Sequence, residues 1–234
     1  MDVIMKTSKI LLSSLLLLIG IQPGFAQSIA FKQFTLKNGL RVLLSEDHAA
    51  PTYSVAVTYN AGSRDEPKGK TGFAHLFEHM MFQGSENVGK GEHMIIVENN
   101  GGEANGNTTN DRTAYFETLP SNQIDLGLYI EADRMRSLVI NQANLDNQRQ
   151  TVQEERRERY DNQPYGKTFE SVIDLAYDNF AYKHSTIGSM ADLDKGTVKD
   201  ASDFFRLEIA DHRQHRIVGR FQVGRSSGEN SEIL

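Results

Sequence analysis

The stretch that decides the fold is Gly72-Phe73-Ala74-His75-Leu76-Phe77-Glu78-His79-Met80-Met81-Phe82. Its apolar residues recur at helical spacing and Gly84 follows as a stop signal, so the stretch predicts an amphipathic helix. Residues at positions i, i+3 and i+4 share one face of a helix. His75, Glu78 and His79 therefore project to the same side, where two imidazoles one turn apart can bind one zinc ion.

The order of these three residues is informative, because a Glu directly before the second His is the inverted form of a zinc-protease helix. A catalytic zinc site takes three protein ligands and leaves one position for water. The chain has no cysteine, so the third ligand is expected to be a His, Asp or Glu from elsewhere. The competing interpretation is that His75 and His79 are ordinary residues of a helix surface.

A second, highly charged helix is predicted from Leu145 to Tyr160, and it supplies the candidates for the third ligand. Helical phase places Leu145, Gln148, Val152, Glu155 and Arg159 on one stripe. Glu154 and Glu158 fall on the polar side, where Glu/Arg pairs on a solvated helix are the better interpretation. We therefore predict Glu155 as the third metal ligand.

The expected chemistry follows from this set of residues. Zinc lowers the pKa of water toward ~7, and Glu78 is close enough to take the proton as a general base. The same carboxylate can then deliver the proton to the leaving amine as a general acid. The set predicts hydrolysis of peptide bonds.

The remaining pattern predicts strands before and after this helix and further helices toward the C-terminus. A hairpin is expected over 31–46 around Asn38-Gly39. Other strands are expected over Thr52–Tyr59 and Thr113–Leu119, and helices over Glu92–Asn99, Asn122–Ser137 with Asn122 as the cap, and Phe169–Tyr177.

Length and composition are those of an ordinary globular protein. The chain has 234 residues, of which 38% are hydrophobic and 24% charged, which favours one domain of about 200 residues. Its formal net charge of -6 argues against the basic surface that nucleic acid requires. We expect no nucleic-acid partner.

The first 26 residues predict a signal peptide. Lys6 and Lys9 precede an apolar run from Ile10 to Ile21, and Gly24-Phe25-Ala26-Gln27 follows, so cleavage is expected after Ala26. An uncleaved membrane anchor is the alternative, but the run is short of the ~20 residues that span a bilayer. The mature chain is expected in a periplasm or outside the cell, with no membrane span.

Several blocks together resemble one protein family. They are Asn38-Gly39-Leu40-Arg41-Val42, the stretch over 72–82, Gly101-Gly102, Asn105-Gly106-Asn107-Thr108 and Glu131-Ala132-Asp133-Arg134-Met135. In this order they resemble the N-terminal zinc-binding domain of the pitrilysin or insulinase family of metallopeptidases, in its bacterial, mitochondrial-processing-peptidase-like branch. The likeness runs from Phe34 to Phe205.

The resemblance implies an α+β fold, with a mostly antiparallel sheet and helices packed on one face. It implies a zinc cofactor, places Glu155 at the third ligand, and implies peptides or unfolded proteins as substrates. It also implies that Asn105, Gly106, Asn107 and Thr108 lie at an exposed strand edge, where a substrate could add as a further strand. A plain turn is the alternative for this Asn/Thr-rich segment.

The sequence departs from the family pattern at two places. Many members carry a carboxylate two helical turns before the third ligand, where this chain has Gln148. After the domain expected over 27–206, residues 207–234 are expected to form a polar tail unlike the family, and we hypothesise truncation or a frame shift after about Arg206.

These departures leave a second function open. A second family-like domain or subunit is expected to complete the enzyme by closing over the zinc. A non-catalytic zinc-binding or protein-interaction subunit that lacks this half is the alternative. The histidines outside the motif, His48, His93, His184, His212 and His215, are interpreted as surface, core or tail residues.

Overall fold

The computed structural model describes residues 29–210 and 216–221. The chain divides into two units, Met1–Ala30 and Phe31–Leu234, and the described helices and strands belong to the second. The predicted signal peptide over 1–26 lies outside the described residues, as do His212 and His215. Within the described ranges, no helix has the length and apolar character that crossing a bilayer would require.

A six-stranded sheet forms the framework of the described part of the chain, in the order β1-β2-β6-β3-β5-β4. Its neighbouring strands are antiparallel except for the parallel pair β2 and β6. The strands are β1 Lys32–Thr35, β2 Arg41–Glu46, β3 Thr52–Tyr59, β4 Glu103–Thr108, β5 Thr113–Pro120 and β6 Arg216–Phe221.

One face of this sheet is apolar. Side chains alternate between the two sides of a strand, and the residues that point to this side are apolar. Along β3, Tyr53, Val55, Val57 and Tyr59 are buried, whereas Ser54 between them is exposed. The opposite face carries polar groups, such as the Ser54 hydroxyl, which bonds that of Thr118 on β5 at 2.8 Å.

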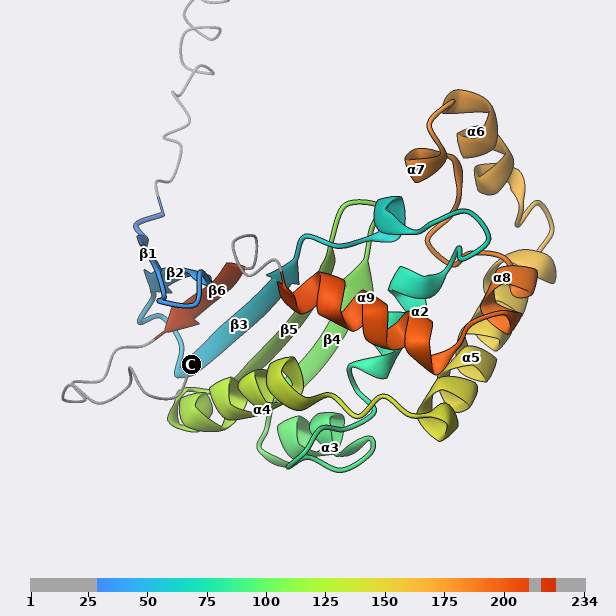
Figure 1. Cartoon of the computed structure of the whole chain (residues 1–234). Coiled ribbons are helices and arrows are strands. Elements are labelled where there is room, and N and C mark those ends of the chain that lie inside the picture. Colours follow the sequence, from blue (N-terminus) through green and yellow to red (C-terminus); the bar gives the residue numbers. More distant parts are fainter. Residues whose placement is uncertain (1–28, 211–215, 222–234) are drawn as a thin grey trace, which may run out of the picture. The chain divides into compact units, whose positions relative to one another are not determined.

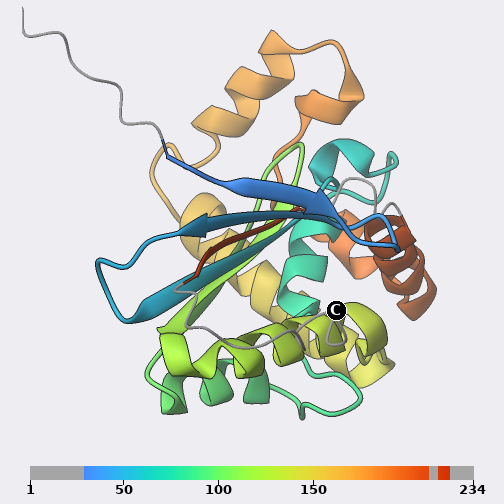
Figure 2. The same ribbon diagram turned by 90° about the vertical axis from the view of Figure 1, so that its left-hand side faces the viewer.

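Helices cover the apolar face, as Figure 1 shows for α4 and α9 across the strands. Figure 2, turned by a right angle, shows α2 and α9 on the same side of the strands. This arrangement confirms the predicted α+β class, with a mostly antiparallel sheet and helices on one face. The helices are α2 Phe73–Met80, α3 Glu92–Asn99, α4 Ile124–Ser137, α5 Gln142–Arg156, α6 Thr168–Ala176, α7 Phe180–Lys183, α8 Met190–Asp194 and α9 Val198–Ala210, with short 3-10 turns over Ser63–Asp65 and Ser121–Gln123.

The helix α2 is held from two sides. Phe77 and Met80 belong to the cluster of buried side chains between sheet and helices. Leu76 belongs to a second cluster, with Leu145 and Val152 of α5. Burying a large apolar side chain contributes about 1.5–3 kcal/mol, so both clusters fix the position of this helix.

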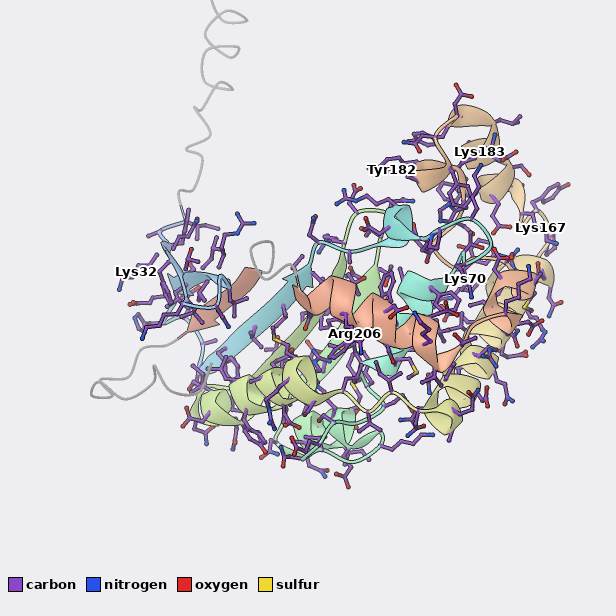
Figure 3. All side chains as sticks on the ribbon, viewed as in Figure 1. Lys32, Lys70, Lys167, Tyr182, Lys183 and Arg206 are labelled. Atoms are coloured by element: carbon purple, nitrogen blue, oxygen red, sulfur yellow. The ribbon has the colours of Figure 1, made fainter. Side chains whose placement is uncertain are left out.

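Two polar contacts join elements that are far apart in the sequence. Lys70, labelled in Figure 3, contacts Asp200 of α9 at 2.7 Å. Tyr182 of α7, also labelled there, donates to Asp111 in the turn between β4 and β5 at 2.8 Å. The first contact ties the segment before α2 to α9, and the second ties α7 to the β4–β5 turn.

The ends of two helices differ from the predicted ones. The helix α5 begins at Gln142 because the Asn141 side chain accepts from the Asn144 N–H at 2.8 Å. It ends at Arg156 and continues as a π-helical turn over Arg157–Asp161. Asn122 does not cap α4: it lies in a 3-10 turn, and α4 starts at Ile124 without a side-chain cap.

Part of the segment expected as a polar tail after Arg206 has regular secondary structure. The helix α9 continues to Ala210, and Arg216–Phe221 form β6 between β2 and β3. The sequence does not indicate this strand, because only two neighbouring β-branched residues, Ile217 and Val218, stand in a segment that is otherwise mostly polar.

Candidate metal centre

Two helices bring three potential ligands together. His75 and His79 extend from α2, and their Nε2 atoms are 3.3 Å apart. Glu155 extends from α5, and its Oε2 lies 3.6 Å from His75 Nε2 and 3.4 Å from His79 Nε2. Glu155 follows the two histidines by 76 and 80 positions in the sequence, yet the three ligand atoms converge on one point.

The spacing fits a zinc ion. Ligands about 2.0–2.1 Å from a zinc ion in a tetrahedral arrangement lie about 3.4 Å from one another. The three observed separations of 3.3, 3.4 and 3.6 Å match this value. Nitrogen and carboxylate oxygen are also donor types that zinc accepts.

The protonation states suit a metal site. Burial, with a smaller effect of His79, lowers the pKa of His75 to about 4, so this ring is neutral at pH 7 and keeps a lone pair. The hydrogen bond with His79 lowers the pKa of Glu155 despite its burial. Arg159 contacts Glu155 Oε1 at 2.7 Å, and the other oxygen, Oε2, faces the imidazoles.

The start of α2 is fixed by a buried carboxylate. Gly72 precedes the helix with a φ of 90° and has no side chain to cap it. Glu66 caps it instead, because its oxygens accept from the N–H of Gly72 at 3.0 Å and of Ala74 at 2.7 Å. His184 Nε2 lies 2.9 Å from the same carboxylate. The hydrogen bonds of Glu66 thus fix the backbone up to Ala74, the residue before His75.

Glu78 lies on the same helix face as the two histidines. Burial raises the pKa of its carboxyl, and a hydrogen bond from Thr108 opposes this rise. The Thr108 Oγ1 donates to Glu78 Oε2 at 2.5 Å. A Cβ on Gly106 would come within 3.2 Å of Glu78 Cγ, so this position on β4 leaves little room for a side chain.

The strand β4 is at the edge of the described sheet, next to β5 alone. Gly106 N–H donates to the side chain of Asn105 at 2.8 Å. This main-chain donor is therefore not used in the ladder with β5. Asn105 and Asn107 are exposed, whereas Gly106 and Thr108 are partly buried toward α2.

All the residues expected at the site line one cavity of about 440 Å³. They are His75, Glu78, His79, Asn105, Gly106, Asn107, Thr108 and Glu155. Four further residues line the cavity without having been expected at the site from the sequence: Arg159, Tyr160, Thr186 and Ile187. Arg159 had a usable signal, since it follows Glu155 by one helical turn, whereas Thr186 and Ile187 come from a loop between α7 and α8.

Gln148 is buried on α5 and is not among the residues that line this cavity. Its amide donates to Asn147 Oδ1 at 2.8 Å. The residue that stands where many family members have a carboxylate is thus engaged within its own helix.

A second group of potential ligands, His93, Glu117 and Glu131, is fully buried. A cation is already present there, because Arg134 donates to both oxygens of Glu131. Burial, then the charge of Glu131, raises the pKa of Glu117 to about 9, and burial lowers that of His93 to about 3. In the absence of a bound cation both groups are therefore neutral at pH 7.

Comparison with known proteins identifies relatives of this chain. Residues 41–189 match the model of the insulinase family, peptidase family M16. The zinc protease PqqE of Helicobacter pylori is 37% identical over 174 residues, which are 74% of this chain and 39% of that protein. The human mitochondrial-processing peptidase subunit beta is 28% identical over 72% of this chain and 34% of its own length.

Solved structures show the same fold. A protease from Helicobacter pylori superposes with a TM-score of 0.81 and 33% identity, over 85% of this chain and 48% of the other. Pitrilysin superposes with a TM-score of 0.75 at 19% identity, over 88% of this chain and 22% of the other. This chain spans less than half the length of these relatives. The family match covers more than half of its residues, and the chain belongs to the insulinase family, peptidase family M16.

Proposed function

We propose that this chain is the zinc-binding part of a metalloendopeptidase, with His75, His79 and Glu155 as the metal ligands. The observation that carries the proposal is the convergence of their three ligand atoms at separations of 3.3 to 3.6 Å. The family supports a peptidase in general, and the names of relatives such as the zinc protease PqqE support zinc.

A zinc ion bound there supplies Lewis-acid chemistry, which lowers the pKa of water and polarises a carbonyl group. The proton transfers fall to Glu78. Its carboxylate lines the same cavity as the three ligands and can take a proton from water and pass it to the nitrogen of the leaving amine. One residue then serves as base and afterwards as acid.

The substrate we propose is a peptide or an unfolded protein in extended conformation. The edge strand β4 supports this, because Asn105, Gly106, Asn107 and Thr108 all line the cavity. The Gly106 N–H bonds only its neighbouring side chain in the described structure. A substrate carbonyl could replace that side-chain oxygen and add a strand to the sheet.

A second family-like domain or subunit is the partner we propose. The chain covers 39% of the zinc protease PqqE of Helicobacter pylori and 48% of the solved protease from that organism, so these relatives contain a further segment of comparable or greater length. The same observation favours one alternative: a zinc-binding subunit that is inactive until a partner positions the substrate.

Zinc titration beside a fluorogenic peptide assay tests the proposal. Glu78→Gln is expected to bind zinc like the wild type while peptide hydrolysis falls about 10²- to 10⁴-fold. Glu155→Gln is expected to lose zinc binding. Glu154→Gln is the matched control, because Glu154 is the neighbouring, exposed carboxylate that pairs with Arg157.

Each result separates the possibilities. Zinc binding by Glu155→Gln that equals that of Glu154→Gln would remove Glu155 from the metal site. Zinc binding without hydrolysis by the wild type, followed by hydrolysis once a partner domain is added, would favour the alternative subunit role.

We also propose export of the chain to a periplasm or out of the cell. The pattern of residues 1–26, with two lysines before an apolar run and a small residue at Ala26, supports it. N-terminal sequencing of the protein isolated from its native host is expected to begin at Gln27. An intact Met1 or Met5 on the isolated protein would contradict cleavage.

A further inference from the structure

We infer that Thr108 is a positioning residue whose hydroxyl holds the Glu78 carboxylate in the orientation that proton transfer needs. The inference deepens the proposed function, because it rests on Glu78 as the proton-transfer group. It gives the side chain of Thr108 a role separate from that of its main chain at the edge of the sheet.

The contact joins two elements that the sequence separates by 30 residues. Thr108 ends β4, and Glu78 lies in α2. The 2.5 Å separation of Thr108 Oγ1 and Glu78 Oε2 is at the short end of the range for a hydroxyl that donates to a carboxylate. An ionised carboxylate only accepts hydrogen bonds, so the hydroxyl is the donor.

Strand geometry explains why this residue can reach Glu78. Side chains alternate across a strand, and Thr108 shares a side of β4 with Gly106. Gly106 lies against Glu78 without a side chain, which leaves room for the carboxylate beside the strand. The threonine hydroxyl then meets its Oε2.

The hydrogen bond is needed because little else in the structure fixes this carboxylate. No other hydrogen bond to the Glu78 side chain is found within the described residues. The terminal torsion of a glutamate is broad, so a carboxylate without this donor can turn within the cavity. A displacement of about 1 Å at a reacting group can reduce a rate by about 10²-fold.

The arrangement connects substrate and base through one strand. The main chain of β4 lies at the sheet edge proposed for the substrate, and the Thr108 side chain reaches the proton-transfer group. The strand β4 would then determine where Glu78 lies relative to a bound peptide, because it contacts both.

The first experiment measures kinetics on the full chain saturated with zinc. Thr108→Val keeps the shape of the side chain and removes the donor, and we expect kcat to fall about 10- to 100-fold with KM nearly unchanged. Thr108→Ser restores the hydroxyl and should recover most of kcat. Zinc stoichiometry should equal that of the wild type in both variants.

Thr113→Val is the matched control. Thr113 pairs with Thr108 in the β4–β5 register, is fully buried, and donates its hydroxyl to Ala61 O at 3.0 Å. It loses one hydroxyl bond beside the site without touching Glu78. A kcat for Thr108→Val within about twofold of that of Thr113→Val would overturn the inference.

The second experiment does not depend on activity. A double-mutant cycle with Glu78→Leu, which removes the acceptor, and Thr108→Val on the unfolding of the metal-free chain measures their coupling. We expect Thr108→Val to lower the denaturation midpoint clearly more with Glu78 present than in the Glu78→Leu background. Additive effects would overturn the contact, whereas strong coupling in a chain that cleaves no peptide would contradict only the proposed function.

Discussion

The substitution Glu117→Gln is expected to stabilise the chain at neutral and alkaline pH. Glu117 is 1% exposed, and neither of its oxygens has a hydrogen-bond partner within the described structure. Burial and the charge of Glu131 raise the pKa of Glu117 from 4.5 to about 9, against the opposing charge of Arg134. The folded chain therefore holds a neutral carboxylic acid at this position at pH 7.

The sign and size of the effect follow from this shift. A carboxyl with a raised pKa in the folded state contributes fully to stability below its unfolded pKa, and the contribution is lost as the pH rises toward about 9. pH 7 lies about 2.5 units above the pKa of the unfolded carboxyl. Keeping this carboxyl protonated in the folded chain therefore lowers the free energy of unfolding by about 3 kcal/mol at pH 7. Glutamine has the same shape and never ionises, so the variant avoids this loss.

Urea denaturation of both proteins between about pH 5 and pH 8 measures the difference. The advantage of Glu117→Gln should be small near pH 5 and grow by about 1.4 kcal/mol per pH unit. Glu103→Gln, at an exposed position of β4, is the control and should show a constant difference. If Glu117 instead forms a charged pair with His93, 3.5 Å away, the glutamine variant will be less stable at pH 7 and the reasoning fails.

Three further predictions concern the metal centre. Removing zinc with a chelator should abolish peptide hydrolysis and lower the melting temperature, and added zinc should restore both; a melting temperature that ignores the chelator would contradict a metal bound to the folded chain. Glu66→Ala removes the acceptor of two buried N–H groups and should cost about 1–3 kcal/mol of unfolding free energy by urea denaturation, with an unchanged midpoint as the contrary result. Gly106→Val places atoms near 3.2 Å from Glu78 Cγ and should reduce kcat while zinc binding persists; wild-type kcat in this variant would show that the strand can shift.

The sequence predicted best where a single periodicity decides the outcome. Helical phase along 145–160 distinguished Glu155 from Glu154, and the structure places Glu155 toward the imidazoles while Glu154 is exposed. Helical phase separates the two carboxylates because Leu145 and Val152 mark the buried side of α5.

The local residue pattern did not predict a strand over Glu103–Thr108, although the family resemblance implied an exposed strand edge at Asn105–Thr108. The strand β4 has the sequence Glu-Ala-Asn-Gly-Asn-Thr, whose Asn and Gly residues are depleted in strands. It is a strand because it pairs with β5 from Glu103↔Thr118 to Thr108↔Thr113. The loop residues Thr186 and Ile187 line the cavity because their segment packs against the start of α2. No local sequence pattern predicts that long-range contact.

Metal binding and substrate positioning have different structural requirements in this chain. The three potential ligands and Glu78 come from α2 and α5, which the cluster of Leu76, Leu145 and Val152 packs together. The start of α2 is fixed by Glu66 from the same unit. Zinc affinity should therefore depend on residues that this chain already contains. The proposed substrate strand, by contrast, has support only from β4 in the described structure, so a partner domain should change KM and kcat far more than the affinity for zinc.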